Sequence, residues 1–197
     1  YCDEISPLLY GFTTDFYEAL VTSKFRKELE DKYGKFLFDQ AECSLKTFSE
    51  EVIPQLQEEN KLSSKYDKLI ASAKIPFDGE ERTLSQMVPY TQSKDRNIRK
   101  DAAKKVAEFF SANKHEFDEI YDKLVKVRTE IAHKLGFKNY VELAYARLRR
   151  LDYNAKDVAG YRKQVLENIV PLHSELRERQ AKRLGIDKLK FYDEPIK

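Results

Sequence analysis

Residues 117–136 read FDEIYDKLVKVRTEIAHKLG, and this stretch decides the fold class. Apolar side chains recur in it every three or four residues, which is the spacing of one face of an α-helix. The stretch closes at Gly136, a residue type favoured just past the end of a helix. The sequence therefore predicts a long amphipathic helix here. Its apolar positions are Phe117, Ile120, Leu124, Val127, Ile131 and Leu135.

Helical patterns continue on both sides of this stretch. Ser6 and Pro7 suit the start of a first helix, because Pro is favoured in the first helical turn. The apolar face of that helix would hold Leu9, Phe12, Phe16 and Leu20. After Ser49, one pattern reaches about Asn60 and a second begins at Ser63 or Ser64. Ser93 is predicted to cap a helix that reaches about Asn113.

Two further helices are predicted in the C-terminal part of the chain. One begins at Asn139 and runs through Arg150. The other is the longest, from Asn154 to Gly185, and Pro171 lies inside it. Proline removes one helical hydrogen bond and clashes with the carbonyl four residues back, so we expect a kink there.

Residues 74–84 break the helical pattern. Asp78-Gly79 stands between two short extended segments, and both residues suit the positive φ angles of a two-residue hairpin turn. We therefore predict a small β-hairpin near residues 75–83. Thr83 and Gln86, three residues apart, then match a capping box at the start of the next helix.

The composition agrees with an all-α fold. The chain has 197 residues, 41% of them hydrophobic, but only 6 Gly and 6 Pro. Average usage would supply roughly twice as many, and sandwiches and barrels need frequent turns. We predict a multi-helix domain over residues 1–197, with long kinked helices, that is a segment of a longer protein.

Charge and cysteine content limit the partners. No apolar run is long enough to span a membrane, and Cys2 and Cys43 form no disulfide framework, so we expect a cytoplasmic protein. Residues 91–197 carry a net charge of +8, against −6 for residues 1–90. A basic half favours nucleic-acid binding, but acidic residues alternate with basic ones, as solvated helix faces do. We therefore expect no nucleic acid and no membrane as partner.

Without comparison to other proteins, the sequence shows no complete catalytic motif. His115-Glu116 resembles the start of the zinc motif H-E-x-x-H, but Glu119 occupies the position of the second His. One imidazole and one carboxylate rarely hold zinc without further ligands, so we expect no metal bound to this segment. The sequence also lacks a G-x-S-x-G nucleophile motif and a Gly-rich phosphate loop.

Arg147 and Arg150 are the polar cluster with the best claim to a site. On a helix that continues through residue 150 they would share a face, where one carboxylate could meet both. An intramolecular salt-bridge network is the favoured interpretation, and binding of a substrate carboxylate is the alternative.

Several ordered motifs resemble one known family. Residues 127–147 read VRTEIAHKLGFKNYVELAYAR, residues 74–79 read KIPFDG, and residues 93–100 read SKDRNIRK. With Asp152-Tyr153-Asn154 downstream, this order resembles the oligoendopeptidase F family, zinc metallopeptidases related to thimet oligopeptidase. The resemblance covers nearly the whole chain.

The resemblance implies a function for a parent protein. Family members are mostly helical hydrolases with a deep channel that admits short, unstructured peptides. Their zinc ligands, two His of H-E-x-x-H and a later Glu, lie in a C-terminal catalytic portion that this chain lacks. The resemblance thus implies a channel-wall segment of a zinc metalloendopeptidase, with oligopeptides as the parent's substrate and no catalytic residue in this chain. By itself the segment would be inactive.

A different class of function stays open from the sequence. A non-catalytic helical binding or scaffold module would show the same composition and the same absence of catalytic motifs. An H-E-x-x-H motif encoded downstream would favour the peptidase, whereas a stop codon near Lys197 would favour the binding module.

Overall fold

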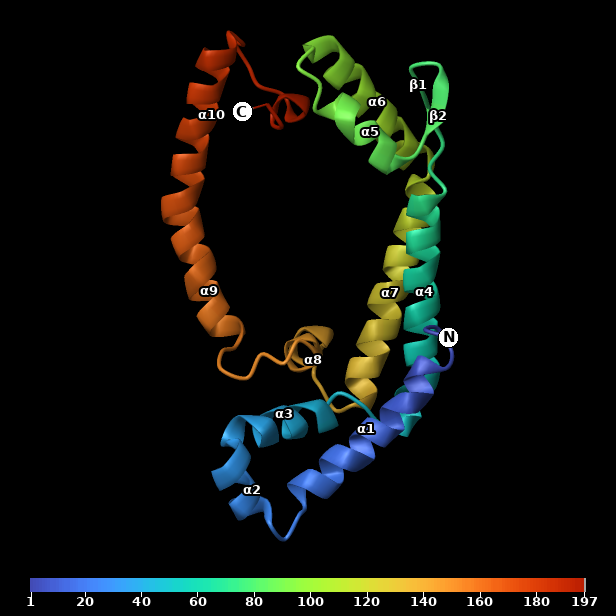
Figure 1. Ribbon diagram of the computed structural model, residues 1–197, viewed down its shortest axis with the longest axis vertical. Coiled ribbons are helices and arrows are strands. Elements are labelled where there is room, and N and C mark those ends of the chain that lie inside the picture. Colours follow the sequence, from blue (N-terminus) through green and yellow to red (C-terminus); the bar gives the residue numbers. More distant parts are fainter. Residues whose placement is uncertain (197) are drawn as a thin grey trace. The chain divides into compact units, whose positions relative to one another are not determined.

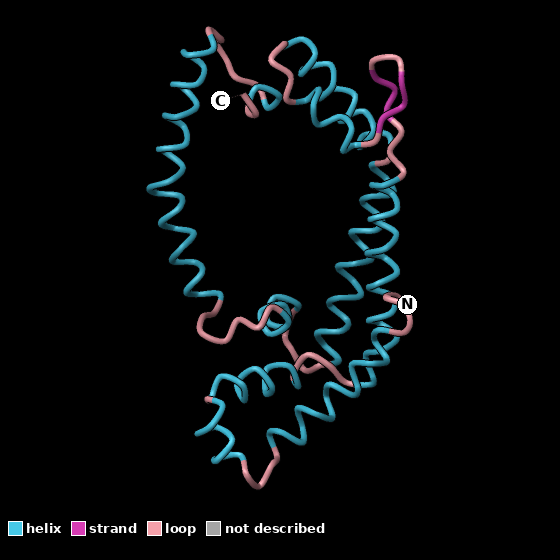
Figure 2. The backbone as a smooth tube through the Cα atoms, in the orientation of Figure 1, coloured by secondary structure: helices cyan, strands magenta, loops and turns pink. Residues whose placement is uncertain are grey.

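The computed structural model describes residues 1–196, which fall into two compact units. The first unit consists of residues 1–66 and 119–155, and the second of residues 67–118 and the described residues from 156 onward. Helices dominate both units, and the sheet found among the described residues is a two-stranded hairpin (Figure 2). The predicted all-α class with one small hairpin is therefore confirmed. The assignment of residues 1–197 to a single domain stays a prediction.

The elements of the first unit alternate with short turns. In chain order they are α1 Ser6–Val21, α2 Arg26–Tyr33, α3 Lys35–Leu45, the 3-10 turn η1 Glu50–Val52, the first part of α4 Ile53–Ala71, most of α7 Lys114–Lys134, and α8 Tyr140–Arg147. In this unit α4 and α7 run side by side, and α8 lies near the end of α7 (Figure 1).

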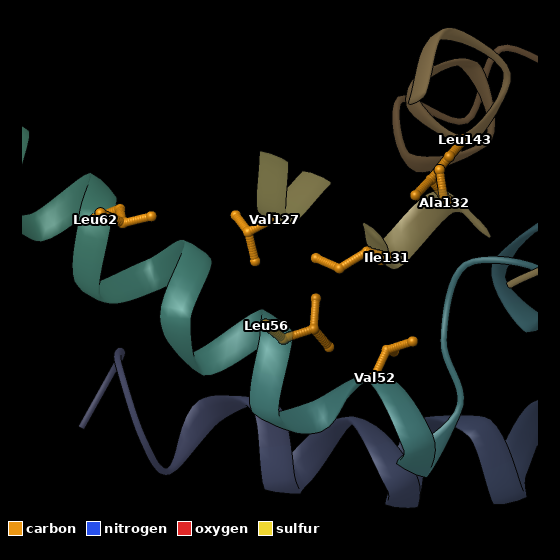
Figure 3. Packing of buried hydrophobic residues seen from close by; sticks show 7 residues of the cluster. All are labelled: Val52, Leu56, Leu62, Val127, Ile131, Ala132 and Leu143. Atoms are coloured by element: carbon orange, nitrogen blue, oxygen red, sulfur yellow. The ribbon is translucent and has the colours of Figure 1, made fainter. Parts of the chain in front are cut away.

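The core of the first unit lies between α4, α7 and α8. The face predicted for residues 117–136 supplies Val127 and Ile131, which pack against Val52 of η1 and Leu56 of α4 (Figure 3). Leu143 of α8 closes the cluster and is fully buried. Each large side chain buried in this way contributes about 1.5–3 kcal/mol to folding.

Helix α4 differs from its prediction. We expected two helices, one ending near Asn60 and another starting at Ser63 or Ser64, but α4 is continuous from Ile53 to Ala71. The hydroxyl of Ser63 donates a hydrogen bond to the carbonyl of Glu59 within the same helix, at 3.0 Å. Serine is favoured at helix caps and turns, but inside a helix its hydroxyl can bond back to the preceding turn, as it does here.

The predicted apolar face of α1 is not buried as a core face would be. Phe12 and Phe16 are 73% and 61% exposed, although their spacing is that of a buried stripe. The periodicity correctly indicates a helix but does not reveal what its apolar face contacts.

The second unit contains the hairpin and the C-terminal helices. Its elements are the end of α4, β1 Ile75–Phe77, β2 Glu80–Arg82, α5 Leu84–Thr91, α6 Arg96–Ala112, the start of α7, α9 Ala155–Gln164, the π-helical turn η2 Val165–Ile169, α10 Val170–Leu184, and the 3-10 turn η3 Phe191–Asp193. Its small core groups Ile75 of β1, Met87 of α5 and Ala102 of α6.

The hairpin has the predicted turn. Ile75 pairs with Arg82 in antiparallel register, and Asp78 and Gly79 have φ angles of 53° and 77°. Two consecutive positive φ values define a type I′ turn, which matches the right-handed twist of the strands. The capping box of Thr83 and Gln86 is present at the start of α5.

The long C-terminal pattern is interrupted where proline occurs. Instead of one kinked α-helix from Asn154 to Gly185, the chain forms α9, the π-helical turn Val165–Ile169 and α10. Pro171 stands in the first turn of α10, and the π-turn before it accommodates the missing hydrogen bond. Helix α10 ends at Gly185, whose φ is 63°, as expected for a glycine C-cap.

Candidate functional site

A buried carboxylate on α4 is the centre of the polar cluster in the first unit. Glu59 lies on the turn after Leu56, so it faces the core side of α4 and is only 9% exposed. Two guanidinium groups compensate its charge. Arg128 Nε of α7 donates to Glu59 Oε1 at 2.7 Å, and Arg147 Nη1 of α8 donates to Oε2 at 2.9 Å. The cluster therefore ties three helices together.

An aromatic ring accompanies the two arginines. Tyr140, the first residue of α8, has its ring centroid 5.7 Å from Arg128 Cζ and 5.9 Å from Arg147 Cζ. The ring face attracts cations, which adds to the attraction by Glu59. One atom lacks a partner: Arg147 Nη2 is buried and has no hydrogen bond among the described residues.

A pocket opens beside this cluster. Its volume is about 560 Å³, within the range typical of small-molecule sites. Glu59 and Arg147 line one side of it, and Phe48 and Leu56 supply apolar surface. The remaining lining residues are mostly polar: Tyr10, Thr13, Thr14 and Tyr17 of α1, Ser44 and Thr47, Asn60 and Ser63 of α4, and Ala146 and Arg149.

The end of α8 places Arg149 at the pocket. We expected this helix to run through Arg150, but it ends at Arg147. The amide of Arg149 bonds to the Ala146 carbonyl, and that of Arg150 bonds to the Tyr145 carbonyl, at 2.9 and 3.0 Å. This is the hydrogen-bond pattern of a Schellman motif, with Arg149 in the left-handed conformation at φ 51°.

Arg150 is separated from Arg147 by this turn. Its guanidinium carbon lies 4.7 Å from the Tyr145 ring centroid and 5.8 Å from that of Tyr153, and it does not line the pocket. The expectation that Arg147 and Arg150 share a helix face was wrong, because the helix stops before Arg150. Arg147 has the predicted carboxylate partner, Glu59, whereas Arg150 contacts two rings.

The second unit contains a second buried carboxylate that the sequence did not suggest. Asp193 of η3 is fully buried and accepts hydrogen bonds from Arg96 Nε and Arg99 Nη2 of α6, both at 3.0 Å. The Arg96 guanidinium, with help from the Lys190 amide and Arg99, holds the pKa of Asp193 well below its usual range despite burial. Arg99 also donates to the Tyr192 carbonyl at 3.1 Å, so the whole C-terminal turn is held on α6.

The described residues do not fit a zinc site. Among residues 1–196, no group of three or more His, Cys, Asp or Glu side chains could hold a metal ion. His115, His133 and His173 lie on α7 and α10 and are all exposed. We therefore assign no metal-dependent step to side chains of this chain. Within the same range, no helix has the length and apolar character needed to cross a membrane.

Comparisons with known proteins identify the family. The peptidase M3 N-terminal domain matches residues 1–48, and peptidase family M3 matches residues 89–195, which is more than half of the chain. The chain belongs to peptidase family M3. No curated protein matches it.

Solved structures resemble this M3 chain closely. A protein assigned as oligoendopeptidase F from Bacillus anthracis is 58% identical, with a TM-score of 0.94 over 98% of this chain and 36% of its own. PZ peptidase A in complex with an inhibitor is also 58% identical, with a TM-score of 0.95 over 98% of this chain and 34% of its own. The chain thus spans about a third of the length of these relatives.

Two buried charged residues of this M3 chain, Glu59 and Arg99, had signals in the sequence. Glu59 stands three residues from both Leu56 and Leu62, so a charge interrupts an apolar helical stripe. Arg99 likewise precedes Ala102 and Ala103 on the buried side of α6. A charged residue inside an apolar stripe predicts a buried ion pair, because an unpaired buried charge is costly. The identity of the partner could not be read from the sequence, since Asp193 is 94 residues away from Arg99.

Proposed function

We propose that this chain is a helical segment of the channel wall of a zinc-dependent metalloendopeptidase that hydrolyses short oligopeptides. The observation that carries the proposal is the match to peptidase family M3 over residues 89–195. A 58% identity to a protein assigned as oligoendopeptidase F, over 98% of this chain, supports the narrower activity.

The proposed division of labour places the zinc ligands outside this chain. The relatives have roughly two-thirds of their length beyond the part that this chain matches, and we assign the metal and the attacking water to that portion. The helices described above would enclose the peptide and exclude folded substrates. The partners of the chain are then the catalytic portion and the oligopeptide, with no nucleic acid and no membrane.

Within this proposal Arg147 has a structural role first. Its guanidinium neutralises Glu59, and a buried carboxylate without such a partner is strongly destabilising. Arg150, held between two tyrosine rings, is the weaker candidate for contact with substrate. We further propose a cytoplasmic location, in keeping with two unpaired cysteines, Cys2 and Cys43.

The proposal is tested with the full-length protein and with the 197-residue chain side by side. Each is incubated with a quenched fluorogenic oligopeptide, with and without a chelator. We expect chelator-sensitive cleavage by the full-length protein and none by the chain alone. Cleavage by the chain alone would place the active site within it, and an inactive zinc-loaded full-length protein would favour a binding module.

A further inference from the structure

The pocket beside Glu59 is built by residues of the first unit. Its walls come from α1, the end of α3, α4 and the end of α8, all within one compact unit. We propose that this pocket binds the carboxylate end of a small ligand that also presents N–H groups, namely a free amino acid or the C-terminal residue of a peptide. The proposal does not depend on the peptidase activity.

The charges at the pocket favour an anionic group. Arg147 and Arg149 line it with two positive charges, and Glu59 contributes one negative charge. Glu59 is already bonded to Arg147 and also to Arg128, which adds a further positive charge behind the wall. The balance around the pocket is therefore positive. A guanidinium fork suits the planar geometry of a carboxylate.

Four other polar groups of the lining favour a ligand with hydrogen-bond donors. The hydroxyls of Thr14, Thr47 and Ser63 donate to backbone carbonyls of their own helix or turn, at 2.7–3.0 Å. Each donor is thus engaged, and the oxygen lone pairs remain as acceptors. The Asn60 amide nitrogen likewise donates to the Cys2 carbonyl at 2.9 Å, which leaves its carbonyl oxygen to accept.

This combination distinguishes an amino acid or peptide end from a phosphate. An amino acid or peptide end presents a carboxylate together with an ammonium or amide N–H. The carboxylate suits the arginines of the lining, and the N–H suits its hydroxyl and amide oxygens. Inorganic phosphate carries more negative charge and mostly acceptor oxygens. It would face Glu59 and the lone pairs of the hydroxyls without satisfying them.

Backbone conformation gives a second, independent reason to single out Arg149. Its φ of 51° lies in the left-handed region, which Gly or Asn normally occupies at this place after a helix. A non-glycine residue is disfavoured there, and such strain is concentrated at functional sites. Arg149 is one of the residues that line the pocket, and a glycine at this position would offer the pocket no side chain.

The same conformation provides a clean variant. Arg149→Gly removes the guanidinium and relieves the positive φ, so it should leave the fold intact, whereas Arg149→Lys keeps the charge. Lys138→Gly is the matched control, because Lys138 is an exposed residue of the same unit that does not line the pocket. Circular dichroism and thermal melting of each variant confirm that it is folded.

The test measures binding and needs no hydrolysis. Isotope-labelled chain is titrated, with NMR detection, against leucine, acetyl-Ala-Leu, its C-terminal amide, and inorganic phosphate. We expect shifts at Thr14, Ser63 and Arg149 with the two carboxylates, and affinity for them about tenfold lower in Arg149→Gly but unchanged in Lys138→Gly. Leucine and the acetylated acid then distinguish a free amino acid from a peptide end.

Three outcomes would overturn the proposal. They are equal binding of the amide and the acid, tighter binding of phosphate than of either carboxylate, and the absence of shifts at millimolar ligand in the folded chain. An equal loss of affinity in Lys138→Gly and Arg149→Gly would show that overall charge, and not the pocket, attracts the ligand.

Discussion

Glu59 is buried among apolar side chains and is stable there because Arg128 and Arg147 reach it from two other helices. Removing one arginine leaves the carboxylate with half of its compensation, and the loss of a charged hydrogen bond costs about 1.5–3 kcal/mol. Of the two arginines that the sequence analysis selected, Arg147 bonds to Glu59 and Arg150 does not. Replacing them should therefore change the stability of the chain by different amounts.

We predict that Arg147→Ala lowers the free energy of unfolding by about 1–3 kcal/mol, because it breaks the pair with Glu59. Arg150→Ala removes only contacts with two tyrosine rings, so its effect should stay below about 1 kcal/mol. Denaturant unfolding of the two variants measures the difference. Equal effects, or a larger effect of Arg150→Ala, would contradict the assignment.

The hairpin turn depends on one glycine. Gly79 has a φ of 77°, which strains a β-branched residue, so Gly79→Val should destabilise the chain by about 1 kcal/mol or more. Gly79→Asn is the control, since asparagine tolerates the left-handed region. The denaturant midpoint should be highest for the wild type, lower for the Asn variant and lowest for the Val variant. A Val variant as stable as the wild type would show that the turn is not needed.

At the scale of the element, periodicity predicts helices well and their ends less well. The face of residues 117–136 and the Asp78-Gly79 turn are present as predicted, because spacing and φ preference act locally. The end of α8 was missed, since a Schellman turn with Arg149 in place of glycine has no sequence signal. The cap of α6 was also misplaced: Asp95, and not Ser93, accepts the amide of Asn97 at 2.8 Å.

The attachment of η3 to α6 should depend on pH. The pKa of Asp193 is lower in the folded chain than in the unfolded one, because Arg96 and Arg99 bond its charged form. The unfolded chain then takes up the proton first as pH falls, so this contribution is complete above about pH 4 and is lost below it.

We therefore predict that Asp193→Asn is less stable than the wild type at pH 7 by about 3 kcal/mol. The difference should shrink as pH falls from about 4 toward 2. Urea unfolding at a series of pH values measures it. Asp15→Asn, at an exposed position on α1, is the control and should follow the wild type. A gap between Asp193→Asn and the wild type that stays constant down to pH 2 would contradict the role of Asp193.

At the scale of the whole molecule, the family assignment adds what the physical pattern does not contain. Amphipathic spacing identifies the apolar face of α1, yet Phe12 and Phe16 are largely exposed in the described residues. A pattern shows that a face is apolar, but the surface that covers it is a long-range property. The pocket beside Glu59 is also a long-range property, because its lining residues range from Tyr10 to Arg149 in the sequence. Ordered motifs related to a known family, in contrast, indicated the peptidase relationship from the sequence.

The last prediction concerns zinc binding by the chain. Zinc sites in proteins use three or four His, Cys or carboxylate ligands brought together in space, and the described residues contain no such group. His115 is exposed on α7, and Glu119 takes the place where H-E-x-x-H has its second His. We therefore predict that the 197-residue chain retains no stoichiometric zinc after dialysis, whereas the full-length protein retains it. Elemental analysis measures both, with His115→Ala as the matched variant of the chain. Zinc that stays bound to the chain and is lost on His115→Ala would overturn the prediction. That result would show a metal site that includes His115.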